Sequence, residues 1–385
     1  MARSTIDRRD NGRYRARYVG PDKRWKSKTF DRKIDAERWL RHQLSSIDRG
    51  EWIDPALRRT RFGELAERWL PTIAALRPKT RANYESLLRS HVLPTFGEVE
   101  LAGINRVVAR EWLAGLQAAG LSASRTRQAR QVLSSILELA VDGGYLVANP
   151  ARGLKVQGGQ EREMLHLDAS QVKSLFDATE ELRPGSGLLV QILVQILAYG
   201  GLRWGEAVAI RRGRCDLLRS KLMVRESLSE VRGHLYFGPT KTHEDRVIVL
   251  PKFLREAMAV HLAQYVAPET DTLVFTSPKG EPLRISNWRR RVWRPACEAS
   301  GMPDGLRIHD LRHTSASLLV SAGANVKVVQ RHLGHSTATQ TLDRYAHLFT
   351  EDLEAVADHL DQVWAAGNEA YKRATTEPRV VDFGS

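Results

Sequence analysis

The stretch from His309 to Tyr345 limits the possible folds of this chain more than any other part of the sequence. Apolar residues recur in it at helical spacing, and two glycines, Gly323 and Gly334, interrupt the pattern. A glycine directly after an apolar-periodic segment is typical of a helix C-terminus. We therefore predict three short consecutive helices: residues 309–322, residues 325–333, and a third that starts near residue 336 and carries Tyr345 close to its end.

The same stretch concentrates side chains that can act on a phosphodiester. His309 and Arg312 have the spacing H-x-x-R, His335 follows Gly334, and Tyr345 lies ten residues later. A phosphoryl-transfer transition state mostly needs positioning and positive charge, which fixed cationic groups supply. This set of residues favours attack on phosphorus by a phenol.

A metal site is an alternative interpretation of the stretch. His309 and His313 are four residues apart on the predicted helix, as in some pairs of zinc ligands. However, Asp310 follows the first histidine where such a motif has glutamate, no third ligand is evident, and Arg312 would place a cation beside the metal. We therefore expect no metal and no other cofactor.

An arginine upstream occupies a position that suits anion binding. The buried helix predicted at residues 188–199 is broken by Gly200 and Gly201, directly before Arg203. Arg203 therefore falls at the start of the next helix, where backbone N–H groups also favour anions. Glu206 lies three residues later and is positioned to orient the guanidinium, although a plain surface ion pair would give the same pattern.

A lysine lies in a predicted turn between short strands. Lys241 follows Pro239 and Thr240, in the turn before the last of three strands predicted at residues 222–228, 235–238 and 246–250. A second H-x-x-R spacing, at His243 and Arg246, shows that this spacing alone is weak evidence. Since Arg246 belongs to the last predicted strand, we favour His309 as the histidine of the motif.

The N-terminal sixty residues are strongly basic. They carry 17 Lys and Arg against 9 Asp and Glu, a net +8 of the total of +14. Such an excess favours a polyanionic partner, with nucleic acid first and an anionic membrane second. Two strands, at residues 13–18 and 25–30, and a helix capped by Asp31 are predicted here. A small sheet braced by one helix is a plausible DNA-binding module, although its charge has a simpler interpretation as a solvated surface.

Strict alternation along the first of these strands places three arginines on one face. We expect Lys26 and Lys28 to extend this face, and Tyr14, Tyr18 and Trp39 to form the small core behind it. The candidate DNA-binding residues of the module are Arg13, Arg15, Arg17, Lys26 and Lys28.

The remaining patterns predict a mainly α chain with α+β parts. Helices are expected at residues 62–73, 78–88, 104–118 and 124–141, followed by a polar, glycine-containing linker, and the acidic tail is expected to become irregular after Gly367. The predicted segments are a small basic sheet-plus-helix domain (1–60), a helical domain (61–150), a linker (151–164), a mostly helical domain with a small antiparallel sheet (165–350) and a tail (351–385).

The composition favours a cytoplasmic chain. The longest apolar run, at residues 188–198, contains two glutamines and is too short to span a bilayer. The N-terminus has no apolar segment typical of a secretory signal. The two cysteines, Cys215 and Cys297, have no metal-binding spacing and fit a reducing compartment.

Together these residues resemble the signature of the tyrosine recombinases, specifically the phage integrase branch. That pattern has an early arginine, a lysine on a β-hairpin, H-x-x-R, a Gly-His pair and a tyrosine near the end. The resemblance covers roughly residues 60–350, and the matching residues occur in the family's order: Arg203, Lys241, His309, Arg312, His335 and Tyr345.

The resemblance implies a metal-independent cleavage mechanism. Tyr345 would attack the scissile phosphate and form a 3′-phosphotyrosyl link, while Arg203 and Arg312 hold the two non-bridging oxygens. Lys241 would protonate the leaving 5′-oxygen. The best candidate for the base is His309, with His335 binding the phosphate or sharing that role. The covalent bond conserves the phosphodiester energy, so strand exchange would need no ATP.

The resemblance also implies partners. They are double-stranded DNA with core and arm-type attachment sites, three further protomers in a tetramer on DNA, a host DNA-bending protein and a directionality factor, all in the cytoplasm of a bacterial host. Glu206 would support the first arginine. A chromosome-dimer resolvase or a transposon integrase is the alternative within the family. Outside it, a metal-dependent nuclease and a non-catalytic DNA-binding protein are the alternatives.

Overall fold

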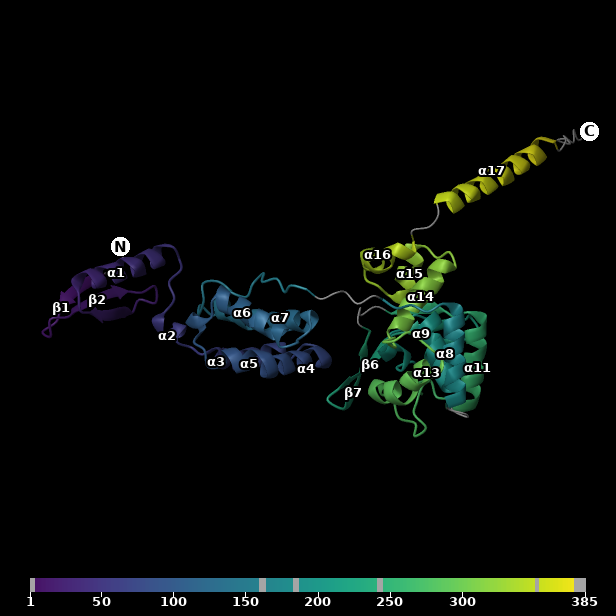
Figure 1. Cartoon of the computed structure of the whole chain (residues 1–385), viewed down its shortest axis with the longest axis horizontal. Helices are drawn as coiled ribbons and strands as arrows, with labels where there is room; N and C mark the ends of the chain where they lie inside the picture. The colour runs from purple at the N-terminus through teal and green to yellow at the C-terminus, as the bar shows by residue number, and fades with distance from the viewer. Residues whose placement is uncertain (1–3, 159–163, 183–186, 241–244, 350–352, 377–385) are drawn as a thin grey trace, which may run out of the picture. The chain divides into compact units, whose positions relative to one another are not determined.

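The computed structural model describes residues 4–158, 164–182, 187–240, 245–349 and 353–376. The chain forms two compact units, Met1–Arg162 and Glu163–Ser385. Both contain hydrophobic cores of their own. Helices dominate both units, with small antiparallel sheets in each, which confirms the predicted fold class (Figure 1).

Unit 1 begins with a three-stranded antiparallel sheet packed against one helix. Alternation along the central strand turns Tyr18 toward the helix, where it is fully buried beside Ala36 and Leu40. Tyr14 and Trp39 pack against the same cluster, so the predicted small core is confirmed. The elements are β1 (Ser4–Arg8), β2 (Tyr14–Val19), β3 (Trp25–Phe30) and α1 (Lys33–Asp48).

In the described part of unit 1, six α-helices follow this sheet and its helix. Their boundaries follow local signals: Pro78 occupies the first turn of its helix, and the side chains of Asn105 and Ser122 accept hydrogen bonds from the first backbone N–H groups of theirs. The helices are α2 (Pro55–Arg58), α3 (Phe62–Trp69), α4 (Pro78–Leu87), α5 (Leu93–Phe96), α6 (Arg106–Ala118) and α7 (Ala123–Asp142).

The linker predicted at residues 151–164 starts too early. Ala151 and Leu154 are buried in the core of the helical part of unit 1. The Asn149 side-chain amide donates to the Ser134 carbonyl and to Glu138, at 2.8 Å in both cases. These residues therefore close the helical core, although their polar and glycine-rich composition suggested an unstructured connection.

Unit 2 is built around a central apolar helix, α9. Residues 190–194 and 196–198 of α9 are buried, and α8, α11 and α14 pack against it (Figure 1). The helices are α8 (Ala169–Leu182), α9 (Gly187–Tyr199), α10 (Trp204–Ala207), α11 (Lys252–Tyr265), α12 (Ile285–Trp288), α13 (Arg294–Ala299), α14 (Asp310–Ser321), α15 (Val326–Leu333) and α16 (Ala338–Tyr345).

The strands of unit 2 form a three-stranded sheet and a separate hairpin. The sheet has the order β4-β5-β8, and β6 pairs with β7, all antiparallel. The strand predicted at residues 222–228 is in fact divided at Arg225 between the two. The elements are β4 (Cys215–Asp216), β5 (Lys221–Val224), β6 (Glu226–Val231), β7 (His234–Pro239) and β8 (Arg246–Val249).

The C-terminal region forms one long helix, α17 (Leu353–Thr376). It continues through Gly367, after which the sequence predicted irregular structure, so that expectation was wrong. A single glycine costs a helix only about 1 kcal/mol relative to alanine, which the flanking helix-forming residues offset. Among the residues that the structure describes, no helix combines the length and apolarity needed to cross a membrane.

Candidate active site

The turn that ends α9 docks directly on α14. Gly201 has a φ of +61°, and a Cβ at this position would lie 2.7 Å from Leu333 and 2.8 Å from the Ser315 hydroxyl. Glycine is therefore required twice, for its backbone conformation and for the close approach. The Arg312 guanidinium donates to the Gly201 carbonyl at 2.6 Å, which connects this turn to the H-x-x-R segment.

Arg203 and Glu206 form one reciprocal contact at the start of α10. The Glu206 carboxylate accepts from the Arg203 backbone N–H at 2.9 Å and from its guanidinium at 2.8 Å. A glutamate at the third helical position that returns to the cap residue is typical of a capping box. Glu206 is buried and Arg203 is partly exposed, so the carboxylate holds the guanidinium at the surface of the site.

Arg246 is a functional candidate that the sequence analysis left as part of a strand. Its guanidinium donates to the buried Glu206 carboxylate at 2.7 Å and to the His332 carbonyl at 3.2 Å. A Cβ at Gly334, whose φ is +66°, would lie 2.8 Å from Cδ of Arg246. Arg246 therefore joins the α10 arginine cluster to the end of α15, directly before His335.

Arg312 is almost completely buried, with 2% of its surface exposed. It donates to the carbonyls of Gly201 and Leu333, so backbone oxygens rather than a carboxylate hold it. Burial, followed by the charge of Arg203, lowers the pKa of Arg312 to about 9. Positive charge is thus crowded into a poorly hydrated site.

The carboxylate of Glu206 bonds two guanidinium groups and is influenced by the charge of a third. Burial raises the pKa of Glu206, but its hydrogen bond with Arg246 and the charges of Arg246, Arg203 and Arg312 outweigh burial and lower the pKa to about 2. Glu206 is therefore ionised, and the three arginines exceed it by two positive charges. An anion between them would relieve this excess, because charges interact strongly where water is scarce.

Two of the predicted histidines lie near the arginine cluster. Desolvation by the surrounding protein, followed by the charges of Arg312 and Arg203, lowers the pKa of His309 to about 4, although part of its side chain is exposed to solvent. His335 is buried, its Nδ1 lies 2.9 Å from the Thr341 hydroxyl, and burial and the same arginines lower its pKa to about 3. Both imidazoles are neutral near pH 7.

Tyr345 is the last residue of α16, as predicted, and is 2% exposed. Its hydroxyl lies 2.7 Å from Nδ1 of His313, and its ring stacks on that of His335 at 6.3 Å between centroids. Burial raises the pKa of Tyr345, and the charges of Arg312 and Arg344 oppose this effect. The phenol is therefore protonated at neutral pH and has an imidazole within hydrogen-bonding distance.

His313 is the second residue that sequence reasoning missed as a functional candidate. From the sequence alone, His313 was interpreted as a packing side chain or, in the metal alternative, a zinc ligand, and His309 was favoured as the base. A signal was available, because residues four apart on a helix share one face and His313 follows His309 at that spacing. The two rings pack edge to face at 5.3 Å between centroids.

Asp310 and His313 of the H-D-L-R-H segment, the stretch of the metal alternative, have other partners. The buried Asp310 carboxylate accepts from the backbone N–H and the guanidinium of Arg307, at 2.7 to 3.2 Å. His313 is bonded to Tyr345. Within the described ranges, no three His, Cys, Asp or Glu side chains come together as ligands.

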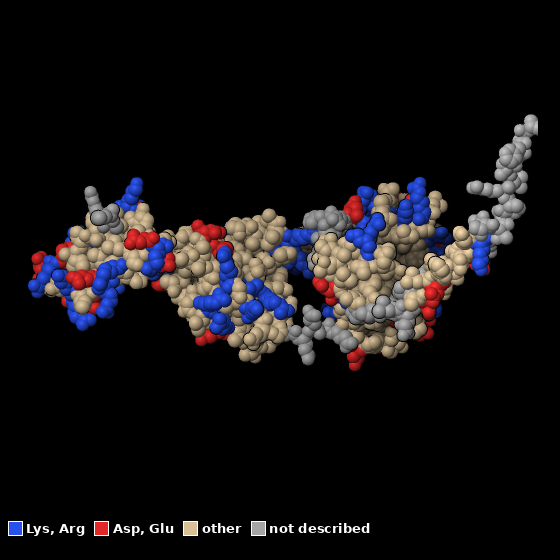
Figure 2. All heavy atoms as spheres, turned by 90° about the horizontal axis from the view of Figure 1, so that it is seen from above, with Lys and Arg blue, Asp and Glu red and all other residues tan. Residues whose placement is uncertain are grey.

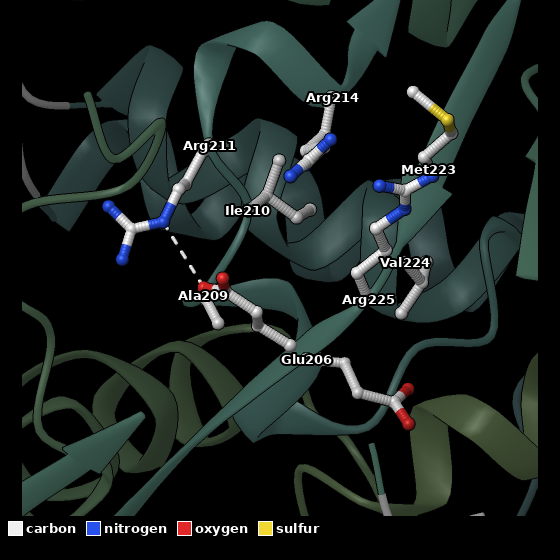
Figure 3. A pocket seen from close by; sticks show the side chains of 9 residues that line it. Glu206, Ala209, Ile210, Arg211, Arg214, Met223, Val224 and Arg225 are labelled. Carbon is white, nitrogen blue, oxygen red and sulfur yellow. Dashed lines mark hydrogen bonds and ion pairs between the residues drawn. The ribbon is translucent and has the colours of Figure 1, made fainter. Parts of the chain in front are cut away.

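A small pocket borders the cluster beside β5 and β6 (Figure 3). It encloses about 10 Å³, room for about one water molecule, which is too little for a nucleotide. Arg211, Arg214 and Arg225 lie around it, and Arg211 donates to Glu226 at 3.1 Å. Glu206 borders the pocket, but the lining does not include Arg203, Arg246 or Arg312, so the pocket lies beside the cation cluster.

Lys241, the predicted general acid, lies outside the described residues. Thr240, the last residue described before the lysine, directly follows β7 and is buried. The position of the lysine relative to the arginine cluster therefore stays a prediction.

The N-terminal sheet corrects one prediction about the basic face. Lys26 and Lys28 pair in register with Tyr18 and Ala16, so they lie on the helix-covered side and do not extend the arginine face. Lys26 also binds two carboxylates, at 2.6 Å from Asp54 and 3.0 Å from Asp22. Successive strand residues alternate between faces, which separates these lysines from the arginines.

The arginines of the opposite face have partners as well. Arg15 and Arg17 both contact Asp7, which lies opposite Arg15 on β1, and Arg13 contacts Asp31. The Arg17 guanidinium also lies 5.5 Å from the Trp25 ring centre. DNA binding by this face stays a prediction, and it requires phosphates to compete with Asp7.

Basic side chains also gather on the helical part of unit 1, in the middle of Figure 2. Some of them have structural contacts: Arg125 donates to Asn83 and Arg130 to the Leu154 carbonyl. Lys79 and Arg127 are exposed near the starts of α4 and α7. Lysines and arginines near helix starts often contact phosphates, which fits a DNA-facing surface.

Comparisons with known proteins agree across the chain. Residues 166–352 match the Phage integrase family, residues 4–49 the Phage integrase N-terminal domain, and residues 61–117 the Phage integrase N-terminal SAM-like domain. A prophage phiRv2 integrase of Mycobacterium tuberculosis is 32% identical over 346 residues, which cover 88% of this chain and 89% of the relative. The integrase of Mycobacterium phage D29 is 30% identical and covers 85% and 88%.

Solved structures support the fold. The Tn1549 transposon integrase in complex with transposon right end DNA has a TM-score of 0.67 at 19% identity, covering 79% of this chain and 99% of that one. A lambda integrase tetramer bound to a Holliday junction has a TM-score of 0.57 at 19% identity, covering 87% and 96%. The matched families, the similarity along almost the whole chain and this fold agree: the chain belongs to the phage integrase branch of the tyrosine recombinases, a family of enzymes that break and rejoin DNA.

Proposed function

We propose that this chain integrates mobile DNA into a bacterial chromosome, by cutting and rejoining two DNA duplexes through a covalent bond between Tyr345 and a 3′-phosphate. The observation that carries the proposal is the cation cluster: three buried or half-buried guanidinium groups exceed their one carboxylate, and the charge of Arg312 acts on the Tyr345 hydroxyl. A scissile phosphate supplies the negative charge that the cluster lacks.

Each of these groups has one role in the proposed reaction. Arg203 and Arg312 hold the two non-bridging oxygens, since a guanidinium donates in a forked geometry that suits phosphate. His309 and His335, neutral near pH 7, donate N–H groups to the same phosphate. Lys241 protonates the leaving 5′-oxygen. Glu206 holds Arg203, and Arg246 holds Glu206.

The proposed assembly is a homotetramer on two duplexes. The lambda integrase relative was solved as a tetramer on a Holliday junction, which supports the same arrangement for this chain. Unit 2 and the helical part of unit 1 bind the core site, and the N-terminal sheet binds arm-type sites through Arg13, Arg15 and Arg17. A host DNA-bending protein and a directionality factor would bring core and arm sites together.

The assignment of the nucleophile is tested with Tyr345→Phe on a nicked suicide substrate, which traps the covalent intermediate. The variant should bind DNA like the wild type and form no denaturation-resistant protein–DNA adduct, because phenylalanine lacks the attacking oxygen. Arg344→Gln, a change of the exposed neighbour, is the matched control and should still form the adduct. An adduct formed by Tyr345→Phe would end the assignment.

A further inference from the structure

The Tyr345 hydroxyl needs a proton acceptor, and the structure supplies one that the family pattern does not include. A phenol with a pKa raised by burial is almost fully protonated at neutral pH, so attack on phosphorus requires removal of its proton. Within hydrogen-bonding distance of the hydroxyl lies Nδ1 of His313, at 2.7 Å. The ring of His309 packs edge to face against that of His313.

We infer that His313 accepts the proton of Tyr345 during cleavage, and that His309 and His335 serve the phosphate instead. The inference rests on the proposed role of Tyr345 as nucleophile. His313 is a catalytic residue in this assignment because it touches the reacting oxygen. It lies on α14 one turn after His309, and the rigid helix positions its ring beside the last residue of α16.

The proton transfer balances in one step. The O–H bond of Tyr345 breaks as an N–H bond forms at Nδ1 of His313, and the freed electron pair forms the O–P bond to the scissile phosphate. The P–O5′ bond breaks, and the 5′-oxygen takes a proton from Lys241. In the reverse step of rejoining, His313 returns the proton to the tyrosine oxygen.

The surroundings of His313 fit an acceptor that is neutral before the reaction. Burial, followed by the charges of His309, Arg344 and Arg307, lowers its pKa to about 4, and the charge of Asp310 opposes this effect. A neutral ring whose Nε2 carries the hydrogen presents a free lone pair at Nδ1. When a phosphate occupies the cation cluster, its negative charge offsets the arginines and raises the proton affinity of the imidazole.

The test measures single-turnover adduct formation by the full chain on the suicide substrate, as a function of pH. His313→Asn places an amide oxygen near the position of Nδ1, so it keeps a hydrogen-bond acceptor but removes a base. We expect it to bind DNA normally and to cleave about 10²- to 10⁴-fold more slowly. Its rate should keep rising with pH toward the pKa of Tyr345, whereas the wild-type rate levels off once His313 is neutral.

His313→Ala with added imidazole provides a second measurement. Free imidazole should restore a large part of the lost rate, because it can occupy the vacated space and accept the proton. His261→Asn is the matched control: His261 is also buried, bonds to the Val274 carbonyl at 2.8 Å and lies in a different part of the core. The DNA binding of each variant measures its amount of folded protein, and the cleavage rates are divided by that amount.

Three results would overturn the inference. Wild-type rates in His313→Asn would show that a hydrogen-bond acceptor without basicity is enough. An unchanged pH profile would show that no proton passes to this residue. Faster cleavage by the His313 variants would show that the contact only restrains a buried tyrosine. An adduct in Tyr345→Phe would instead refute the proposed nucleophile, so the two failures are distinguishable.

Discussion

Replacement of Arg246 by methionine should destabilise unit 2 by about 3–5 kcal/mol. Glu206 is 1% exposed and the Arg246 side chain 8%, so both partners of the 2.7 Å contact are shielded from water. Removing one partner of a buried ion pair leaves the other charge without compensation and typically costs about 3–5 kcal/mol. Methionine keeps most of the aliphatic length, which limits the loss of packing.

The pKa of Glu206 gives a second estimate of the same size. Burial raises this pKa, but Arg246, followed by Arg203 and Arg312, lowers it from the usual 4.5 to about 2. This lowering of the pKa stabilises the folded chain by about 3 kcal/mol. The full stabilisation is present above pH 4.5 and is lost as the pH falls toward 2. Without Arg246, burial should raise the pKa of Glu206, so this carboxylate takes up a proton in the folded variant as the pH falls. The loss of stability should therefore be smaller at pH 5 than at pH 7.5.

Hydrogen–deuterium exchange of the full chain measures this effect locally, through the peptides that contain α10 and β8. Arg219→Met is the matched control, because Arg219 and its partner Asp216 are exposed or half-buried and such pairs contribute at most about 1 kcal/mol. A loss below 1 kcal/mol for Arg246→Met, or an equal loss at both pH values, would refute the reasoning.

The other predictions concern the chemistry, the turn at Gly334 and the N-terminal module. Cleavage should survive excess EDTA; loss of activity that only zinc or magnesium restores would favour a metal-dependent nuclease. Lys241→Ala should slow cleavage by about 10²- to 10⁴-fold, and a substrate with a 5′-bridging sulfur, whose leaving group needs no proton, should restore much of the rate; equal slowing on both substrates would argue against a general acid. Gly334→Ala should cost more stability than Gly323→Ala. Both glycines have positive φ, which costs about 1–3 kcal/mol for other residues, but of the two positions only Gly334 would bring an added Cβ against Arg246. Equal losses would show that the contact between this turn and Arg246 does not contribute to stability. A chain that begins near Arg61 should cleave core DNA but fail to integrate intact attachment sites, and each lost phosphate contact should flatten the log–log salt dependence of binding by about one unit; full integration by this chain would show that the module is dispensable.

Local signals in the sequence were sufficient for the helices that carry the site. Gly323 and Gly334 end α14 and α15 where predicted, and Tyr345 is the last residue of α16. These features depend on side-chain periodicity, caps and glycine conformations within a few residues, and such short-range preferences are encoded in the sequence itself. The same holds for Arg203 at the start of α10 with Glu206 one turn later.

Only the tertiary structure decided which of these groups meet. The contact between His313 and Tyr345 joins residues 32 positions apart, and Arg246 reaches Glu206 and His332 across 40 and 86 positions. Strand register, not composition, placed Lys26 on the helix-covered face of the sheet, opposite the arginine face. Contacts of this kind depend on how whole elements pack. A single sequence can therefore present the residues of a site, whereas the packed chain determines which imidazole lies beside the phenol.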